Sequence, residues 1–118
     1  FGSDWPVVTI SPWPGVQNAL TRQTAEGEPA GGWVPKERIN IEDAVRGYTL
    51  GAAFAGRREK TEGSLETGKL ADLIILSKDL FTIEPPDILN EEVLVTMVGG
   101  KVVYESPNWT NLKVTGTN

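Results

Sequence analysis

Residues 93–105 read VLVTMVGGKVVYE. Two apolar runs, 93–98 and 101–105, flank the pair Gly99-Gly100. Glycine accepts the positive φ that a two-residue hairpin turn needs, so a glycine pair between two strand-like runs is a strong hairpin signal. The stretch therefore predicts an antiparallel hairpin with strands near 92–98 and 101–105.

The segment before the hairpin, residues 63–79, reads GSLETGKLADLIILSKD. Its first part, SLETGK, predicts a tight turn in which Gly68 takes a positive φ. Its second part, ADLIIL, is a short continuous apolar run, which is typical of a strand buried on both faces. We therefore expect a further strand near 71–77, ahead of the breaker EPP at 84–86.

We expect structural rather than chemical roles for the charged residues around this strand. Asp72 stands at the strand entrance, where we expect its carboxylate to bond backbone amides. Lys69 and Lys101 are expected to be solvated turn residues, and the run RREK at 57–60 is expected to form a solvated face.

The chain before residue 56 shows helical periodicity instead. GVQNALTRQTAE predicts a helix near 14–26, and NIEDAVRGYTLGAAFAG predicts one near 40–55 that is capped by Asn40 and ends at Gly56. An irregular surface loop is expected between them, at 26–38. The switch of period near residue 56 predicts an α+β chain. The apolar stripe of the second helix is Ile41, Ala44, Val45, Tyr48 and Ala52.

Composition excludes several classes of protein. The chain has 118 residues, enough for one modest domain, with 11 basic and 16 acidic residues and a net charge of −5. Its basic residues form no stripe, so we expect no nucleic-acid partner. No apolar run approaches the ~18 residues that span a bilayer, so we expect no membrane partner. The absence of cysteine excludes disulfides and thiolate metal sites and favours the cytoplasm.

The chain also contains no histidine. Histidine is the usual general base at neutral pH and the commonest metal ligand, so catalysis needs carboxylates alone or residues from elsewhere. One aspartate stands out, in FGSDWPV at 1–7, which reads as the end of a buried strand and the loop after it. From the residues alone, Asp4 is a loop aspartate that caps the next turn, and Trp5 and Trp13 flank its loop.

Three segments together resemble a known family. GSLETGKLADLIILSKD and VTMVGGKVVYE resemble the turn, strand and hairpin near the C-terminus of metal-dependent amidohydrolases. FGSDWPV, followed by a proline-containing loop and GVQNALTRQ, resembles the end of barrel strand eight and its following helix. The set is most similar to amidohydrolase family 3, with its YtcJ-like and N-substituted formamide deformylase-like members, over most of residues 1–105.

This resemblance implies the architecture of a longer enzyme, with a (β/α)₈ TIM barrel and a small β-sandwich built from both chain ends. Residues 1–55 would be the end of barrel strand eight and the C-terminal helices of the barrel. Residues 56–105 would be the C-terminal part of the composite β-sandwich, and 106–118 a tail. The chain would then be a C-terminal fragment, which its start at Phe1 also favours.

The resemblance also implies a role for Asp4. The matching aspartate binds the catalytic divalent metal, zinc by expectation, or its water. It takes the proton as that water attacks a C–N carbon. Trp5 and Trp13 flank the loop of this site and are candidates for lining a substrate pocket, with simple packing in the core or at an interface as the favoured alternative. The substrate would be a small amide-type molecule.

The family's other metal ligands, a His-x-His pair, a Lys or Glu, and two further His residues, are missing from this chain. We therefore expect the fragment alone to bind no metal and to be inactive, and to associate with the remainder of the barrel or with a second copy. The alternative is a non-catalytic β-rich module that serves in binding or assembly. A coding sequence upstream of Phe1 with His-x-His after a strand would decide between them.

Overall fold

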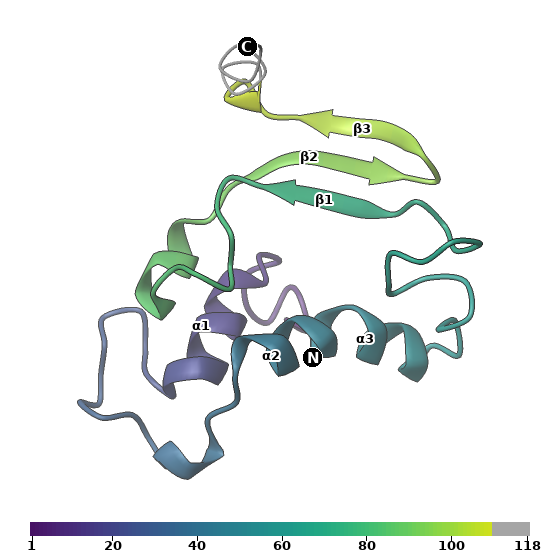
Figure 1. Cartoon of the computed structure of the whole chain (residues 1–118). Coiled ribbons are helices and arrows are strands. Elements are labelled where there is room, and N and C mark those ends of the chain that lie inside the picture. Colours follow the sequence, from purple (N-terminus) through teal and green to yellow (C-terminus); the bar gives the residue numbers. More distant parts are fainter. Residues whose placement is uncertain (110–118) are drawn as a thin grey trace.

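The computed structural model describes residues 1–109, which form a small α+β structure. The three α-helices are α1 (Trp13–Thr21), α2 (Ile41–Tyr48) and α3 (Leu50–Ala55). They precede the three strands β1 (Leu73–Leu76), β2 (Val93–Val98) and β3 (Lys101–Glu105). Two 3₁₀ turns, η1 (Pro35–Glu37) and η2 (Pro85–Asn90), lie in the connections. Figure 1 shows the sheet on one side of the molecule and the helices on the other. The predicted α+β class is confirmed.

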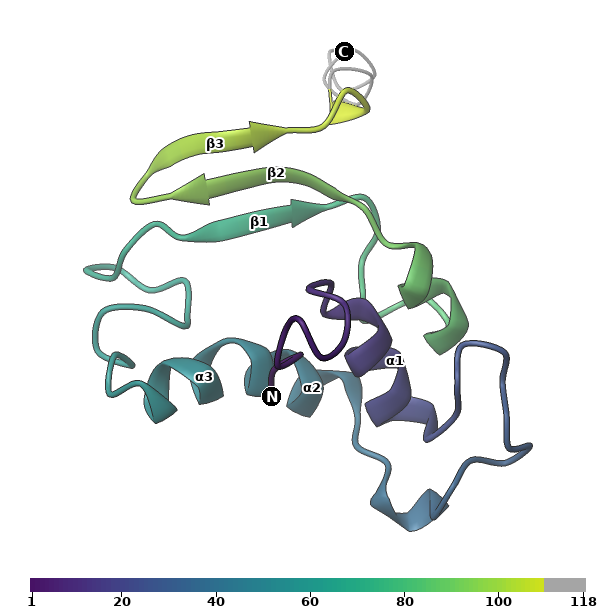
Figure 2. The same cartoon turned by 180° about the vertical axis from the view of Figure 1, so that it is seen from behind.

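The hairpin at the C-terminal side of the sheet forms as predicted. Strands β2 and β3 pair antiparallel, and Val98 faces Lys101 across the turn. Gly99 and Gly100 both have positive φ, 56° and 77°, which is the backbone that such a turn requires. Strand β1 pairs antiparallel with the other side of β2, so the strand order is β1-β2-β3 (Figures 1 and 2).

Strand β1 differs from its prediction in length and in burial. It spans Leu73–Leu76 rather than 71–77. Burial on both faces is wrong for this chain, because Ile74 is 48% exposed and Ile75 is 37% exposed. Within residues 1–109 the sheet has three strands, and no second sheet covers its open face. A continuous apolar run indicates burial only when both faces meet another layer.

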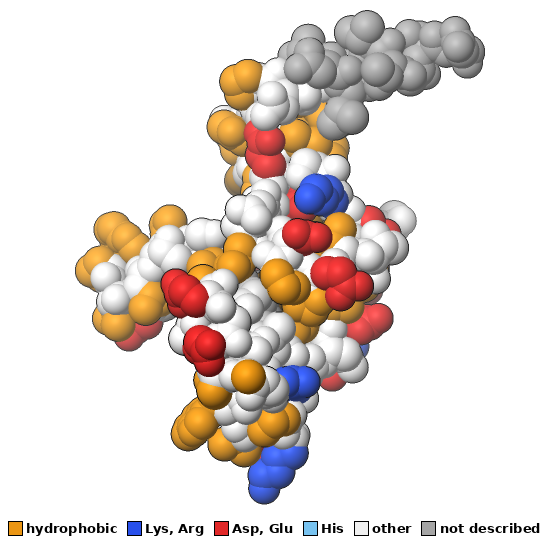
Figure 3. Space-filling model, turned by 90° about the vertical axis from the view of Figure 1, so that its left-hand side faces the viewer, with side chains coloured by type: hydrophobic (Ala, Val, Ile, Leu, Met, Phe, Trp, Pro, Cys, Tyr) orange, Lys and Arg blue, Asp and Glu red, His pale blue; other side chains and the backbone are white. Residues whose placement is uncertain are grey.

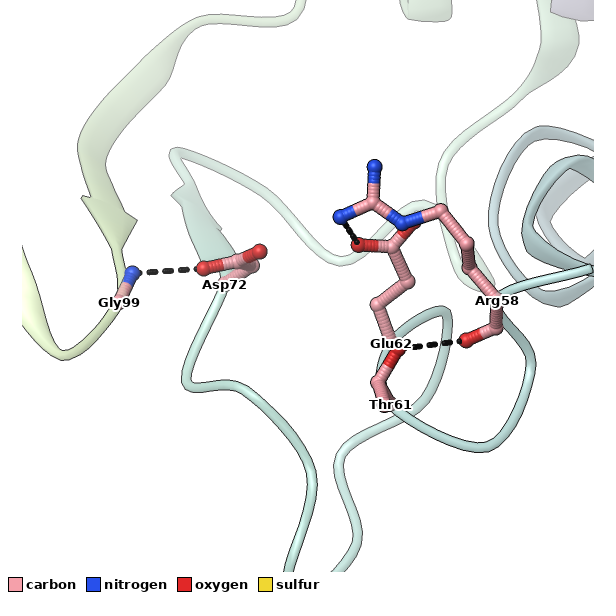
Figure 4. Close-up of polar contacts among 5 residues, drawn as sticks. All are labelled: Arg58, Thr61, Glu62, Asp72 and Gly99. Atoms are coloured by element: carbon pink, nitrogen blue, oxygen red, sulfur yellow. Dashed lines mark hydrogen bonds and ion pairs between the residues drawn. The ribbon is translucent and has the colours of Figure 1, made fainter. Parts of the chain in front are cut away.

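The turn before β1 is tied to the hairpin. Gly68 takes the predicted positive φ, 93°. The Asp72 carboxylate accepts a hydrogen bond from the backbone N–H of Gly99 at 2.6 Å (Figure 4), and the Gly100 N–H donates to the Ala71 carbonyl at 3.0 Å. The expectation for Asp72 is confirmed, and its bond holds the hairpin turn against the start of β1.

Replacing Asp72 tests this clasp. Asp72→Ala in the full-length protein leaves the Gly99 N–H without its acceptor, and we expect a loss of about 1 kcal/mol in the free energy of unfolding. Asp72→Asn keeps an acceptor oxygen and should lose less. Denaturant unfolding measures both variants, and an Asp72→Ala protein as stable as the parent would contradict the clasp.

Two other charged segments depart from expectation. Lys69 is not solvated: its Nζ donates to Ser64 Oγ at 2.6 Å, and its side chain is only 12% exposed. The run at 57–60 is mostly exposed, and Arg58 pairs with Glu62 at 2.9 Å (Figure 4). Glu59, however, is half-buried. In both cases the turn folds back on the chain and covers a side chain that the local pattern placed in water.

Helix α1 is shorter than predicted. It ends at Thr21 rather than near residue 26, because Arg22 takes a left-handed backbone with φ 59°. The Arg22 N–H caps the helix at the Asn18 carbonyl, 2.7 Å away, and its side-chain Nε donates to the Trp33 carbonyl at 3.1 Å. Contacts with the loop that follows therefore end the helix before its apolar periodicity does.

The second predicted helix is present but broken. Asn40 caps α2 as expected, with its Oδ1 2.7 Å from the Asp43 N–H. At Thr49 the backbone leaves helical geometry, with φ −111° and ψ −94°, and α3 begins at the next residue. The break rotates the second half, so Ala52 of the predicted stripe is exposed and Ala53 is buried.

The core joins residues from both halves of the chain. Its buried members, Val16, Ala44, Leu80 and Ile88, come from α1, α2 and the connection that contains η2. Partly buried residues pack around them: Trp13, Leu20, Ile39, Ile41, Val45, Tyr48, Leu76 and Ile83. The part of the predicted apolar stripe that lies in α2 is therefore partly covered by the chain itself. No helix among the described residues is long and apolar enough to cross a membrane.

Candidate functional site

Asp4 lies in an exposed turn of the N-terminal loop. Its carbonyl accepts a hydrogen bond from the Val7 N–H at 2.8 Å, and its φ is 50°. Aspartate tolerates this left-handed backbone better than most residues, which suits it to the turn. The side chain is exposed, so the carboxylate faces outward rather than into the core.

The strand end predicted for residues 1–3 is not present. These residues have no regular secondary structure, because a strand needs a hydrogen-bonded neighbour and none lies beside them in the described chain. Instead Phe1 packs on Tyr48 of α2, with ring centroids 5.1 Å apart. A Cβ at Gly47 would collide with the Phe1 ring, so this glycine permits the contact. Gly47 therefore marks a point of close packing between α2 and the N-terminal residue.

The anchor residue Tyr48 lies close to α1. Its hydroxyl sits against Gly15, where an added Cβ would collide with it. Burial raises the pKa of the Tyr48 hydroxyl above its ordinary value. A shallow hollow of about 330 Å³ opens here, lined in part by Phe1, Asn18 and Tyr48. Asp4 is not among the residues that line this hollow.

The structure places the two tryptophans differently. Trp5 is exposed in the loop beside Asp4. Trp13 begins α1, is half-buried and packs against the core cluster, and its N–H lies 3.4 Å from Ser11 Oγ. Neither tryptophan nor Asp4 lines the hollow beside Tyr48 or a second hollow bordered by Glu42 and Phe81.

A complete metal centre is also not assembled from these residues. Among residues 1–109, no three histidine, cysteine, aspartate or glutamate side chains gather in a group that could hold an ion. The full chain has no histidine or cysteine. Structural and catalytic zinc sites use three or four protein ligands, so the donor set here does not fit a resident metal. Asp4 offers one carboxylate at most.

Two glutamates that directly precede β2, Glu91 and Glu92, were not singled out from the sequence. Glu91 is buried, and its Oε1 accepts hydrogen bonds from Ser77 Oγ and the Lys78 N–H, both at 2.9 Å. Glu92 accepts hydrogen bonds from Ser106 and Asn108, which hold the pKa of its carboxyl below the ordinary value. They face different partners, so these bonds tie strand ends together and form no shared site.

The exposed apolar character of the loop around Asp4 was not predicted from the sequence. Trp5, Val7, Val8 and Ile10 are all exposed. One signal was present in the sequence, because Asp4 is the only residue with a charged side chain among residues 1–21. The single charge of this long stretch lies at the residue proposed for catalysis. The uncharged neighbours of Asp4 are therefore candidate site residues.

The chain matches the family model described as "Amidohydrolase family" over residues 1–104, and it belongs to this family of hydrolases. It is 41% identical over 104 residues to "Protein LONG AFTER FAR-RED 3" of Arabidopsis thaliana, a match that covers 88% of this chain and 17% of the relative.

Two bacterial relatives bear out the resemblance drawn from the sequence. "Putative amidohydrolase YtcJ" of Bacillus subtilis is 32% identical over 88% of this chain and 20% of its own length. "N-substituted formamide deformylase" of Arthrobacter pascens is 36% identical over 89% of this chain and 19% of its own length. The chain thus spans about a fifth of the length of these relatives. No solved structure matches it.

Proposed function

We propose that this chain is the C-terminal part of a metal-dependent hydrolase that acts on carbon–nitrogen bonds other than peptide bonds. The observation that carries the proposal is the family match from residue 1, with Asp4 as the only charged side chain of the first 21 residues. The name of one relative, a deformylase of N-substituted formamides, supports a small amide-type substrate. Without cysteine, the protein suits the cytoplasm.

In this proposal residues 1–55 complete a TIM barrel and residues 56–105 complete a composite β-sandwich, with 106–118 as a tail. Residues 110–118 of that tail lie outside the described part of the chain. Ile74 and Ile75 are exposed on opposite faces of β1, which supports the proposal, because the remainder of the protein, or a second copy, would cover them.

Asp4 would contribute one carboxylate to a centre whose other ligands lie outside this chain. A divalent metal, zinc by our proposal, would lower the pKa of a bound water. Asp4 would be the residue of this chain that hydrogen-bonds the nucleophilic water, and its carboxylate would accept a proton and return it to the leaving nitrogen. Its exposure in a turn supports this role, because the carboxylate is not used in packing. Trp5 and Trp13 would wall the substrate pocket.

A second candidate is a non-catalytic β-rich module for binding or assembly. It is favoured by one observation, that every residue of β3 is exposed. Strand β3 is at the edge of the sheet formed by residues 1–109, and an edge strand can pair with a strand of another chain. The two candidates differ in whether the full-length protein turns over a substrate.

The test is an assay of the full-length protein that contains this chain, with a panel of N-substituted formamides and simple amides. We expect hydrolysis that is lost on chelation and restored by zinc, and metal bound in elemental analysis. The isolated 118-residue chain should show neither metal nor turnover. Hydrolysis that survives removal of all metal would contradict metal dependence, and no hydrolysis of any amide would favour the binding module.

A further inference from the structure

The N-terminal loop carries an unusual concentration of exposed apolar side chains. Trp5 is 64% exposed, Val7 75%, Val8 56% and Ile10 75%. We call residues 5–10 the apolar loop. Hydrophobic side chains gather on the projection at the left of Figure 3, on the side of the molecule where Figure 2 draws the N-terminal segment in front. Contiguous exposed apolar surface marks a place where something binds.

The apolar loop is held in place at both ends. Before it, Phe1 packs on Tyr48 of α2. After it, the Ser11 N–H donates to Thr9 Oγ1 at 3.2 Å, and Trp13 packs against the core. Between these anchors the loop projects from the surface rather than folding onto the core.

The loop lies next to Asp4 by its own geometry. The Val7 N–H donates to the Asp4 carbonyl at 2.8 Å, which closes a turn over residues 4–7. In such a turn the first and fourth Cα atoms are less than about 7 Å apart. A molecule that reaches the Asp4 carboxylate is therefore within side-chain reach of Trp5 and Val7.

The charges of this segment determine what it accepts. Asp4 is the only charged side chain among residues 1–21, and the proposed chemistry uses its carboxylate at the reacting bond. An anionic group on the substrate would find no basic side chain among residues 1–21 to pair with. An apolar group would instead gain from contact with the exposed apolar side chains.

We propose that the apolar loop is a specificity-determining wall of the site around Asp4, and that it selects neutral substrates with an apolar substituent next to the scissile carbon–nitrogen bond. The inference rests on the proposed function and deepens it. Val7 is the residue that tests the inference most directly. The hydrogen bond that closes the turn holds Val7 close to Asp4, and the Val7 side chain is exposed.

The test compares N-alkyl formamides from methyl to hexyl, with a carboxylate-tipped hexyl analogue, on the full-length protein. We expect kcat/KM to rise about fourfold for each methylene that reaches the loop, and the carboxylate to remove the gain. Val7→Asp should lower kcat/KM for N-hexylformamide at least about tenfold more than for N-methylformamide. Val7→Thr, which keeps the side-chain shape, should show the same trend more weakly.

The matched control is Thr67→Asp, which adds the same charge at an exposed position of the turn before β1 and should change neither value. Equal kcat/KM values along the parent's series would overturn the proposal. So would a Val7→Asp protein in which all members fall together with a lowered melting temperature, since the loop would then be covered by another part of the full-length protein.

A binding measurement separates this inference from the proposed hydrolysis. In the full-length Asp4→Asn protein, calorimetry should show tighter binding of N-hexylformamide than of its carboxylate-tipped analogue, and Val7→Asp in that background should abolish the preference. Absence of binding or of preference overturns the inference. Selective binding by a parent protein that hydrolyses no amide would overturn the proposed function and leave the apolar loop as a binding surface.

Discussion

Replacing Asp4 by asparagine in the full-length protein should lower kcat by about 10²–10⁴, since loss of a general acid–base group costs this much in rate. Asparagine keeps the shape of the side chain but removes the charge and the basic oxygen. The fold should survive, because Asp4 is exposed and the described structure uses its backbone carbonyl, through Val7, in the turn. Damage to the metal or its water would add to the loss.

The decisive measurement is kcat of Asp4→Asn alongside its metal content and melting curve. Asp87→Asn is the matched control, because it makes the same chemical change at another exposed carboxylate and should leave kcat unchanged. In the isolated chain Asp4→Asn should change nothing, since we expect metal content and activity there to be at background already. Near-normal kcat would make Asp4 an ordinary loop aspartate, and a protein that fails to fold would make its role structural.

Replacing Ile88 by alanine should cost about 2–5 kcal/mol in the free energy of unfolding, which is the usual range for a buried isoleucine truncated to alanine. Ile88 is 0% exposed and lies in η2, where it joins the core cluster with Val16, Ala44 and Leu80. A cavity at this point would loosen η2 from α1. The hairpin should remain formed, because its backbone bonds lie away from this cluster.

Chemical unfolding of the full-length protein measures this loss, with Leu65→Ala as the control. Leu65 is 74% exposed, so its truncation should change stability by no more than about 0.5 kcal/mol. Equal effects at the two positions would mean that the core cluster does not carry the stability assigned to it.

The sequence predicted what short-range chemistry controls. The glycine pair at 99–100 predicted the hairpin, Gly68 its positive φ, Asn40 the start of α2 and Asp72 its bond to a backbone amide, and the structure has all of these. Each depends on residues within one turn or on a residue type with few conformational alternatives. The family was also evident from three short segments, and the family match confirms it.

Long-range packing was beyond the sequence. The end of α1 depends on Arg22 and its bond to the Trp33 carbonyl, and the break at Thr49 separates what the apolar period joined into one helix. Lys69 was predicted to be solvated, because no local sequence pattern indicates that its ammonium group donates a hydrogen bond to Ser64. The contribution of η2 to the core was not predicted, because the residues EPP at 84–86 indicate only a break in regular secondary structure.

By itself, then, the sequence determined the α+β class, the hairpin and the one aspartate that stands alone in an uncharged segment. Only the tertiary structure decided which apolar residues are covered: Ile88 in a short turn is fully buried, while Ile74 in a strand and Val7 beside Asp4 are open. The physical reason is that hydrophobic pattern states which side chains gain from burial, whereas burial itself needs a surface from elsewhere in the chain. For the sheet and the apolar loop, residues 1–109 do not supply that surface.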